Sequence, residues 1–156
     1  MLSMVSRSSS NSNDPINNAR ILLVDDNANG LSARRSVLEE LGHRIATAAS
    51  GQEALDQFAR HKFDLVVTDF RMPRMDGLEL IVRLRKQAPD LPIILISGFV
   101  DALGLSEAST GADVVIQKSA NEVGHLVRSV GRLLRRKKPP SSERAAGKKK
   151  PGAKSQ

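Results

Sequence analysis

Five short apolar segments alternate with stretches of helical periodicity, and this alternation limits the fold more than any other feature of the sequence. The apolar segments are residues 20–24, 44–48, 65–68, 92–96 and 113–116. The helical patterns that follow them are residues 31–41, 52–60, 78–88, 99–109 and 120–135. Such alternation builds βαβ units, which give a parallel sheet with right-handed crossovers. We therefore predict an α/β fold of five strands and five helices.

Polar side chains stand at the ends of four predicted strands. Asp25 and Asp26 follow the first strand, Asp69 the third, Ser97 the fourth and Lys118 the fifth. In open parallel sheets, ligands bind in the crevice outside the carboxyl ends of the strands. We therefore expect these side chains, although far apart along the chain, to lie close together at a single site.

The stretch around Asp69 is the centre of this expectation. Residues 65–67 form an apolar run of the kind found in inner strands of parallel sheets. A buried carboxylate at the end of such a strand is costly unless something there uses it. Asp76-Gly77 then marks a turn before the next helix. Alone, Asp69 also fits a simple turn cap, but the other strand ends favour a functional role.

The adjacent carboxylates of Asp25 and Asp26 repel each other, and protonation or a cation must relieve this repulsion. Mg²⁺ suits the position because it prefers oxygen ligands and is usually held by one or two carboxylates together with water and phosphate. Asp69 adds a carboxylate from another strand. The alternative interpretation of the pair is a solvated acidic turn that caps the next helix.

Ser97 and Lys118 are candidates for holding a phosphoryl group. The Ser97 hydroxyl could hydrogen-bond a phosphoryl oxygen on Asp69, and Gly98 leaves room for close backbone approach. Lys118 places a point charge near the acidic residues, where it can neutralise carboxylates or pair with phosphate. The alternatives are an ordinary turn at Ser97 and a surface lysine that begins a helix at Lys118.

The helical segments predict which side chains face the core. In the first helix we expect an apolar inner stripe and a charged outer face. The inner residues are Leu31, Val37, Leu38 and Leu41, and the outer residues are Arg34, Arg35, Glu39 and Glu40. The last helix has an inner stripe of Val123, Leu126, Val127, Val130, Leu133 and Leu134. A capping box of Ser119 and Glu122 precedes that stripe. None of the three histidines has a partner residue at a spacing typical of a metal or catalytic site. We therefore expect them at the surface or at helix ends: His43, His61 and His125.

Composition excludes several classes of protein. The chain of 156 residues has no cysteine, which rules out disulfides and thiol chemistry. No apolar run approaches the length of a membrane span. Residues 1–18 are rich in Ser and Asn and lack the apolar core of a signal peptide. We expect a disordered leader there and a cytoplasmic protein that does not contact the membrane.

The net charge of +7 is concentrated near the C-terminus. Residues 20–134 hold 14 Lys and Arg against 15 Asp and Glu, whereas residues 135–156 hold 9 against one. We expect residues 136–156 to be a disordered basic tail, too short for a helix-turn-helix output module. Such a tail could bind nucleic acid or an acidic partner, or could simply keep the protein soluble. It lacks interleaved aromatic residues that stack on bases, so we expect no sequence-specific binding.

Together these residues resemble the receiver domain of response regulators in two-component signalling. The resemblance covers residues 19–135. It rests on Asp25-Asp26, on Asp69 with the following Met72-Pro73 and Asp76-Gly77, and on Ser97 and Lys118. It implies a flavodoxin-like (βα)5 fold, a doubly wound parallel sheet with strand order 2-1-3-4-5.

The resemblance also implies a function. Asp69 would accept a phosphoryl group from the phosphohistidine of a histidine kinase or a phosphotransfer protein. Asp26 and Asp69 would bind Mg²⁺ directly together with the backbone carbonyl of Arg71, and Asp25 would act through water. The phosphoryl oxygens would be held by Ser97 and Lys118. The signal would pass to a downstream protein through helix four, strand five and helix five. Such a domain accepts and loses its own phosphoryl group and is not a turnover enzyme.

Two positions depart from the family pattern. Ser119 follows Lys118 where the family usually has a cis proline, and a cis bond before any other residue costs about 2.5–4 kcal/mol. Val115 stands three residues before Lys118, where the family often has an aromatic switch residue. The sequence therefore leaves the geometry of the 118–119 peptide open. It also favours output coupling through helix four or Phe99.

Three other functions are open to an α/β domain with these residues. A receiver-like module could bind partners without phosphorylation, which Val115 and Ser119 favour and the intact acidic residues oppose. A Mg²⁺ phosphohydrolase of the haloacid dehalogenase type needs a second Asp two residues after the nucleophile, where this chain has Arg71. A flavodoxin needs a hydroxyl- and glycine-rich phosphate loop after the first strand, where Asp25 and Asp26 would repel phosphate.

Overall fold

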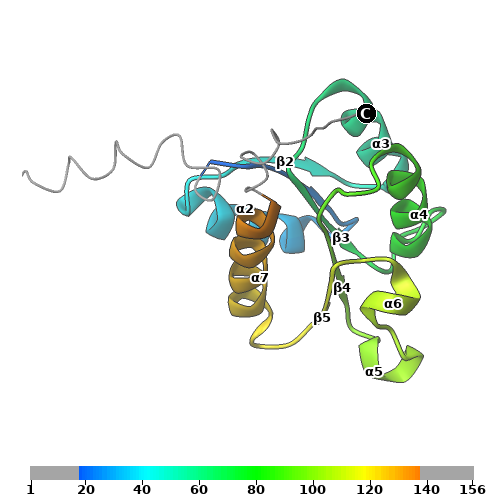
Figure 1. Ribbon diagram of the computed structural model, residues 1–156. Helices are drawn as coiled ribbons and strands as arrows, with labels where there is room; N and C mark the ends of the chain where they lie inside the picture. Colours follow the sequence, from blue (N-terminus) through cyan, green and yellow to red (C-terminus); the bar gives the residue numbers. More distant parts are fainter. Residues whose placement is uncertain (1–17, 138–156) are drawn as a thin grey trace, which may run out of the picture.

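A computed structural model describes residues 18–137, in which a parallel five-stranded sheet is covered by helices on both faces (Figure 1). The strands are β1 (Arg20–Val24), β2 (Arg44–Ala48), β3 (Leu65–Asp69), β4 (Ile93–Ser97) and β5 (Val114–Gln117). All neighbouring strands pair in parallel, in the order β2-β1-β3-β4-β5. The predicted flavodoxin-like sheet is confirmed. Of the predicted leader (residues 1–18) and tail (residues 136–156), residues 1–17 and 138–156 lie outside the described residues, whereas residues 136–137 belong to the last helix and not to a disordered tail.

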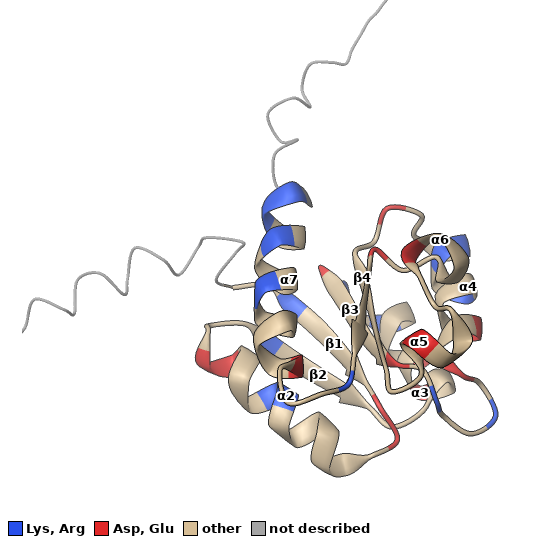
Figure 2. Ribbon diagram, turned by 90° about the horizontal axis from the view of Figure 1, so that it is seen from below, with Lys and Arg blue, Asp and Glu red and all other residues tan. Residues whose placement is uncertain are grey.

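The described part of the chain has six helices, five of them between strands and the last after β5. α2 (Ala28–Glu40) and α7 (Glu122–Lys137) cover one face of the sheet. The helices on the other side are α3 (Gly51–Arg60), α4 (Gly77–Gln87), α5 (Val100–Leu103) and α6 (Glu107–Thr110). α7 carries five Lys and Arg residues and a single acidic residue, and the basic residues form the blue bands along this helix in Figure 2. None of the helices within residues 18–137 combines the length and apolarity needed to cross a membrane.

The strand side chains alternate between two hydrophobic cores, one on each face of the sheet. The core beneath α2 and α7 contains Ile21, Leu23, Leu65, Val67, Ile94 and Ile96. The core beneath α3 and α4 contains Leu22, Val24, Val66, Ile93 and Leu95. Because the central strands are buried on both faces, they form continuous apolar runs in the sequence. The same packing holds the carboxyl ends of the strands in place, where the polar residues stand.

The prediction of a single helix over residues 99–109 is wrong. Two helices of four residues each, α5 and α6, occupy this region. Gly104 ends α5 with a φ of 64°, and Gly111 ends α6 with a φ of 84°. These are left-handed conformations that glycine adopts at low cost and that commonly stop helices.

Two predictions about α2 are also wrong. Arg34, expected on the outer face, is 5% exposed, whereas Leu41, expected in the core, is 43% exposed. The helix ends at Glu40, so Leu41 is its C-cap and lies beyond the inner stripe. Arg34 follows Leu31 by three residues and precedes Leu38 by four, which places all three on one helix face. That face packs toward the sheet, so the Arg34 side chain points inward despite its charge.

Val123 and His43 also differ in exposure from the sequence prediction. Val123 is 38% exposed, because the buried residues of α7 begin at Leu126. His43 stands just after the end of α2, which fits the predicted helix-end position, but it is buried rather than at the surface, and its Nδ1 accepts a hydrogen bond from the Ala19 N–H at 3.1 Å. Burial lowers the pKa of His43, and the negative charge of Asp64 opposes this effect only in part.

We predict that His43 makes the folded domain less stable as the pH falls. Because the pKa of His43 is lowered by folding, the unfolded chain binds the proton more readily. The stabilising effect of neutral His43 is complete above the unfolded pKa of 6.5 and is lost as the pH falls toward the folded pKa. Urea unfolding at pH values from about 8 to about 5 should show a smaller loss of stability for His43→Gln than for the wild type. The exposed His125→Gln serves as the matched control. Equal pH dependence of His43→Gln and the wild type would contradict the prediction.

Candidate functional site

Three carboxylates meet at the carboxyl edge of the sheet. Asp25 and Asp26 follow β1, and Asp69 is the last residue of β3 rather than the first residue after it. β1 and β3 are neighbours, with Val24 opposite Thr68, so their ends coincide. One carboxylate oxygen from each of the three residues lies within 4.8 Å of the other two. Asp25 and Asp69 are buried and Asp26 is exposed.

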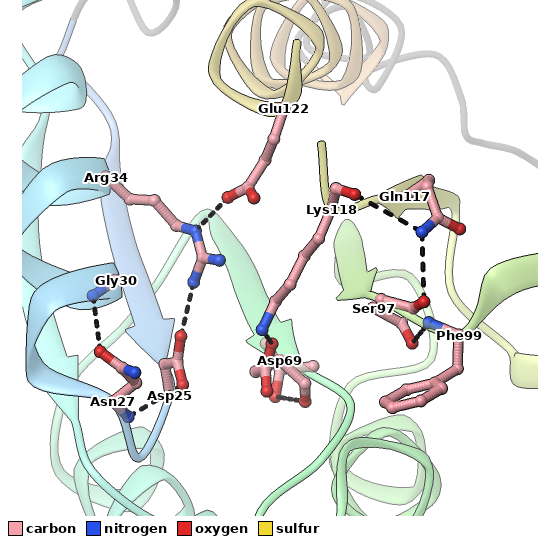
Figure 3. Close-up of polar contacts among 12 residues, drawn as sticks. Asp25, Asn27, Gly30, Arg34, Asp69, Ser97, Phe99, Gln117, Lys118 and Glu122 are labelled. Atoms are coloured by element: carbon pink, nitrogen blue, oxygen red, sulfur yellow. Dashed lines mark hydrogen bonds and ion pairs between the residues drawn. The ribbon is translucent and has the colours of Figure 1, made fainter. Parts of the chain in front are cut away.

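Lys118 reaches this site from the end of β5. Its Nζ lies 2.7 Å from Oδ1 of Asp69, and Figure 3 shows the side chain extended toward the carboxylate. The backbone N–H of Lys118 donates to the Ser97 carbonyl at 2.9 Å, which fixes the start of the loop that leads to α7. All peptide bonds between residues 18 and 137 are trans, including the one that joins Lys118 and Ser119. Lys118 thus reaches Asp69 with a trans bond.

The ionisation of Asp69 reflects opposing influences. Burial raises its pKa, and the hydrogen bond and charge of Lys118 lower it. The neighbouring charge of Asp25 also raises the pKa, whereas Arg34 lowers it. The net result is a raised pKa, so the site holds a carboxylate whose charge is incompletely compensated. An additional cation close to Asp69 would stabilise the ionised form.

Ser97 is the last residue of β4 and is buried next to this group. Asp69 lies opposite Ile96 in the β3–β4 register, so Ser97 is one residue farther along the adjacent strand. Its Oγ accepts a hydrogen bond from the Phe99 N–H at 2.9 Å, and no acceptor for its hydroxyl hydrogen is found among the described residues. The hydroxyl is therefore able to donate to a ligand at the edge of the sheet.

Arg71 and Phe99 pack together at the loops that follow β3 and β4. The guanidinium carbon of Arg71 lies 4.5 Å from the centre of the Phe99 ring, a cation–π contact. Phe99 is 41% exposed. This pair joins the loop after the Asp69 strand to the loop after the Ser97 strand.

Sequence reasoning missed a second cation in the site. The Nη1 atom of Arg34 lies 2.8 Å from Oδ2 of Asp25, and its Nε lies 2.7 Å from Oε2 of Glu122 (Figure 3). Burial by itself would lower the pKa of Arg34, but hydrogen bonds and charges from Glu122 and Asp25 raise it overall, so the guanidinium is fixed as a cation. The helical spacing of Arg34 from Leu31 and Leu38 was the signal that could have placed it inward.

The Arg34 contact also changes the predicted capping box at α7. The Glu122 carboxylate pairs with Arg34, while the Glu122 N–H donates to the Ser119 carbonyl at 3.1 Å. The Ser119 hydroxyl instead accepts from the Asn121 N–H at 3.2 Å. The capping box of Ser119 and Glu122 is therefore replaced by a turn, because the buried guanidinium competes for the carboxylate of Glu122.

The loop after β3 is closed by Gly77. The Gly77 N–H donates to the Phe70 carbonyl at 2.8 Å, and Asp76 caps α4 by accepting from the Glu79 N–H at 3.0 Å. A Cβ atom on Gly77 would clash with the backbone carbonyl oxygen of Asp69. Glycine is thus required where α4 begins against the backbone of the buried aspartate.

The site fits a hard divalent cation. Its donor set consists of carboxylate oxygens, the ligands that Mg²⁺ prefers. Both oxygens of Asp25 already accept protein hydrogen bonds, from the Asn27 N–H at 3.0 Å and from Arg34. Oδ1 of Asp69 is buried and has no polar partner except Lys118 in the described part of the chain. Asp26 and Asp69 therefore have the greater capacity for direct coordination, and Asp25 is more committed to the protein.

Comparison with known proteins finds one recurrent kind of relative. The family model of the response regulator receiver domain matches residues 21–130. The chain is 36% identical over 134 residues to the alkaline phosphatase synthesis transcriptional regulatory protein PhoP of Bacillus subtilis (strain 168), a match that covers 81% of this chain and 53% of PhoP. It is also 36% identical over 122 residues to the response regulator MprA of Mycobacterium leprae (strain TN), covering 77% of this chain and 53% of MprA. The chain thus spans about half the length of the curated relatives it matches.

Solved structures agree with these sequence matches. The receiver domain of the Francisella response regulator 1452 superimposes with a TM-score of 0.70 at 29% identity, covering 77% of this chain and 99% of that domain. The response regulator protein TrrA of Thermotoga maritima, whose structure is a complex with Mg(2+)-BeF, has a TM-score of 0.63 at 35% identity. That match covers 72% of this chain and 98% of TrrA.

We predict that Gly77→Ala destabilises the domain by about 1–3 kcal/mol, because the added methyl group must displace the backbone of Asp69. Urea unfolding measures the change. Gly98→Ala is the matched control, since a Cβ there meets nothing within 4 Å, and its effect should stay within about 0.5 kcal/mol. A Gly77→Ala protein as stable as the control would show that the close approach at Asp69 is unimportant.

Proposed function

The chain belongs to the response-regulator receiver family, and we propose on this basis that it is a phosphoacceptor whose Asp69 takes a phosphoryl group from a histidine kinase or phosphotransfer protein. The observation that carries the proposal is the environment of Asp69. It is a nearly buried carboxylate with a lysine Nζ 2.7 Å away and two further carboxylates close by. A structural carboxylate would need only the lysine, whereas this one is surrounded by additional negative charge.

We propose that Mg²⁺ is the cofactor of this reaction. Asp26 and Asp69 would hold it directly together with the backbone carbonyl of Arg71, and Asp25, whose two oxygens already accept protein hydrogen bonds, would act through water. When bound, Mg²⁺ supplies positive charge that offsets the negative charge of the nucleophile and of the phosphoryl group. The TrrA structure, described as a complex with Mg(2+)-BeF, supports this assignment by analogy.

The side chains of the site then have different roles in the transfer of the phosphoryl group. An oxygen of Asp69 forms the bond to phosphorus while the bond from phosphorus to the histidine nitrogen breaks. Such a transfer depends on positioning and on charge stabilisation more than on covalent help from the protein. Lys118, already on Asp69, stabilises the negative charge that arrives, and the Ser97 hydroxyl donates to a phosphoryl oxygen.

Phosphorylation then acts as a signal because it adds a phosphate charge of about −1.5 to −2 at a single position. Ser97 and Lys118 are drawn toward that charge, which shifts a two-state equilibrium of the surface formed by α5, α6, β5 and α7. Val115 on β5 is only partly buried and has no aromatic ring to move between two states. We therefore assign this part of the coupling to Phe99 and its contact with Arg71. Arg71 also stands where a hydrolase of the dehalogenase type needs its second Asp, so we propose no enzymatic turnover.

The proposal is tested by phosphorylation at Asp69. With acetyl phosphate and Mg²⁺, intact-mass measurement should show one phosphoryl group on the wild type, and chelation of Mg²⁺ should abolish the signal. Asp69→Asn should accept none, because the amide is not a nucleophile for this transfer. Asp101→Asn, which removes an exposed carboxylate of α5, is the matched control and should behave like the wild type.

Two results would contradict the proposal. One is phosphorylation of Asp69→Asn at the rate of the wild type. The other is a wild type that gains no phosphoryl group and whose NMR spectrum does not change with beryllofluoride and Mg²⁺. The second result would favour a receiver-like module that binds partners without phosphorylation, the function that Val115 and Ser119 favour.

A further inference from the structure

Arg34 joins two elements that are distant in the sequence. Its guanidinium holds Asp25, at the end of β1, and Glu122, at the start of α7 and 88 residues away. The Arg34 side chain is 6% exposed and that of Asp25 is 2% exposed, so water screens their ion pair poorly. The other guanidinium contact of α2, between Arg35 and Glu39, is exposed and stays within the helix. Arg34 is therefore the cation of α2 that ties it to other elements.

The two contacts of Arg34 use different nitrogens, Nη1 for Asp25 and Nε for Glu122. A planar guanidinium keeps these donors in a fixed arrangement, so movement of one carboxylate is passed on to the other. The contact is also closely packed. A Cβ on Gly30 would lie 2.8 Å from Oδ2 of Asp25 and 3.6 Å from Nη1 of Arg34.

The loop between β5 and α7 is consequently held to the acidic site at both ends. Lys118, at the start of the loop, pairs with Asp69, and Glu122, at its end, is linked to Asp25 through Arg34 (Figure 3). Any change in the charge around the carboxylates acts on both links. These contacts connect the acidic site to the first turn of α7.

We propose that Arg34 is a positioning residue that couples cation binding at the acidic site to the first turn of α7. The inference rests on the proposed Mg²⁺ site and adds a residue and a route to it. A divalent cation and the Arg34 guanidinium compete for the negative charge of Asp25, so binding of the cation weakens the Arg34–Asp25 pair. The Arg34 guanidinium then interacts more strongly with the Glu122 carboxylate, and the first turn of α7, which carries Glu122, moves with it.

The test is a Mg²⁺ titration of the full chain, followed by calorimetry and by backbone amide NMR. In the wild type, Mg²⁺ should shift the amides near Asp25 and Asp69 and also those of Gly124 and His125 in the first turn of α7. Arg34→Lys should bind Mg²⁺ within about threefold of the wild type, because the charge remains, but should lose the α7 shifts, because a point charge cannot hold two carboxylates in a fixed arrangement.

Two further variants separate the electrostatic effect from the mechanical link. Glu122→Ala should keep Mg²⁺ binding and lose the Mg²⁺-induced shifts at Gly124 and His125. Arg34→Met removes the competing cation and should tighten Mg²⁺ binding by about three- to tenfold. Arg35→Gln on the exposed side of α2 is the matched control and should reproduce both the affinity and the α7 shifts of the wild type.

Each outcome either supports or contradicts the proposed coupling between the acidic site and α7. Undiminished α7 shifts in Arg34→Lys and Glu122→Ala would overturn the coupling, as would unchanged Mg²⁺ affinity in Arg34→Met. If Arg34→Met does not fold, the lysine and alanine variants decide the question. A wild type that binds Mg²⁺ at Asp26 and Asp69 without any response in α7 would overturn this inference alone. A wild type that does not bind Mg²⁺ would overturn the proposed metal site together with it.

Discussion

The repulsion between carboxylates at the carboxyl edge of the sheet is the constraint on which the rest of this structure depends. Asp25, Asp26 and Asp69 bring oxygens within 4.8 Å of one another, and two of the three residues are buried. Like charges this close destabilise the folded state unless cations oppose them. Lys118 and Arg34 supply those cations from β5 and α2, so the separate elements of the domain are held together through this edge.

The sheet makes that concentration of charge possible because, before their last residues, the central strands β1, β3 and β4 bury only apolar side chains and Thr68. Strands buried on both faces leave no position for a charged side chain before they end. The order β2-β1-β3-β4-β5 then places the ends of β1 and β3 side by side, with β4 and β5 next in line. The polar residues that follow these strands have one edge in common, and the hydrophobic packing of the two cores holds it against the repulsion.

Most of this arrangement could be predicted from the sequence. The prediction was wrong where the charge of a residue and its position on the helix indicate opposite orientations. The apolar runs identified all five strands, and the residues after them identified the edge where Asp25, Asp69 and Lys118 meet, although their chemical roles stay predictions. Arg34 was placed outward because it is charged, yet its spacing from the buried leucines of α2 turns it inward, toward carboxylates that only the folded chain brings near. The partner in α7 lies 88 residues away, and no local pattern could have supplied it.

Arg34 also alters the balance of charge on which the proposed phosphoryl transfer depends. With Glu122, the second partner of Arg34, four carboxylates opposed by Lys118 and Arg34 leave a formal charge of −2, which binding of a dication would neutralise. Transfer to Asp69 would replace a carboxylate by a phosphoryl group of about −1.5 to −2, which would leave the site only slightly negative. A site with an apolar residue in place of Arg34 would be more negative at each step and would bind the dication more tightly. In this chain, the charge of the buried arginine would keep the site closer to neutral at each step of the proposed transfer.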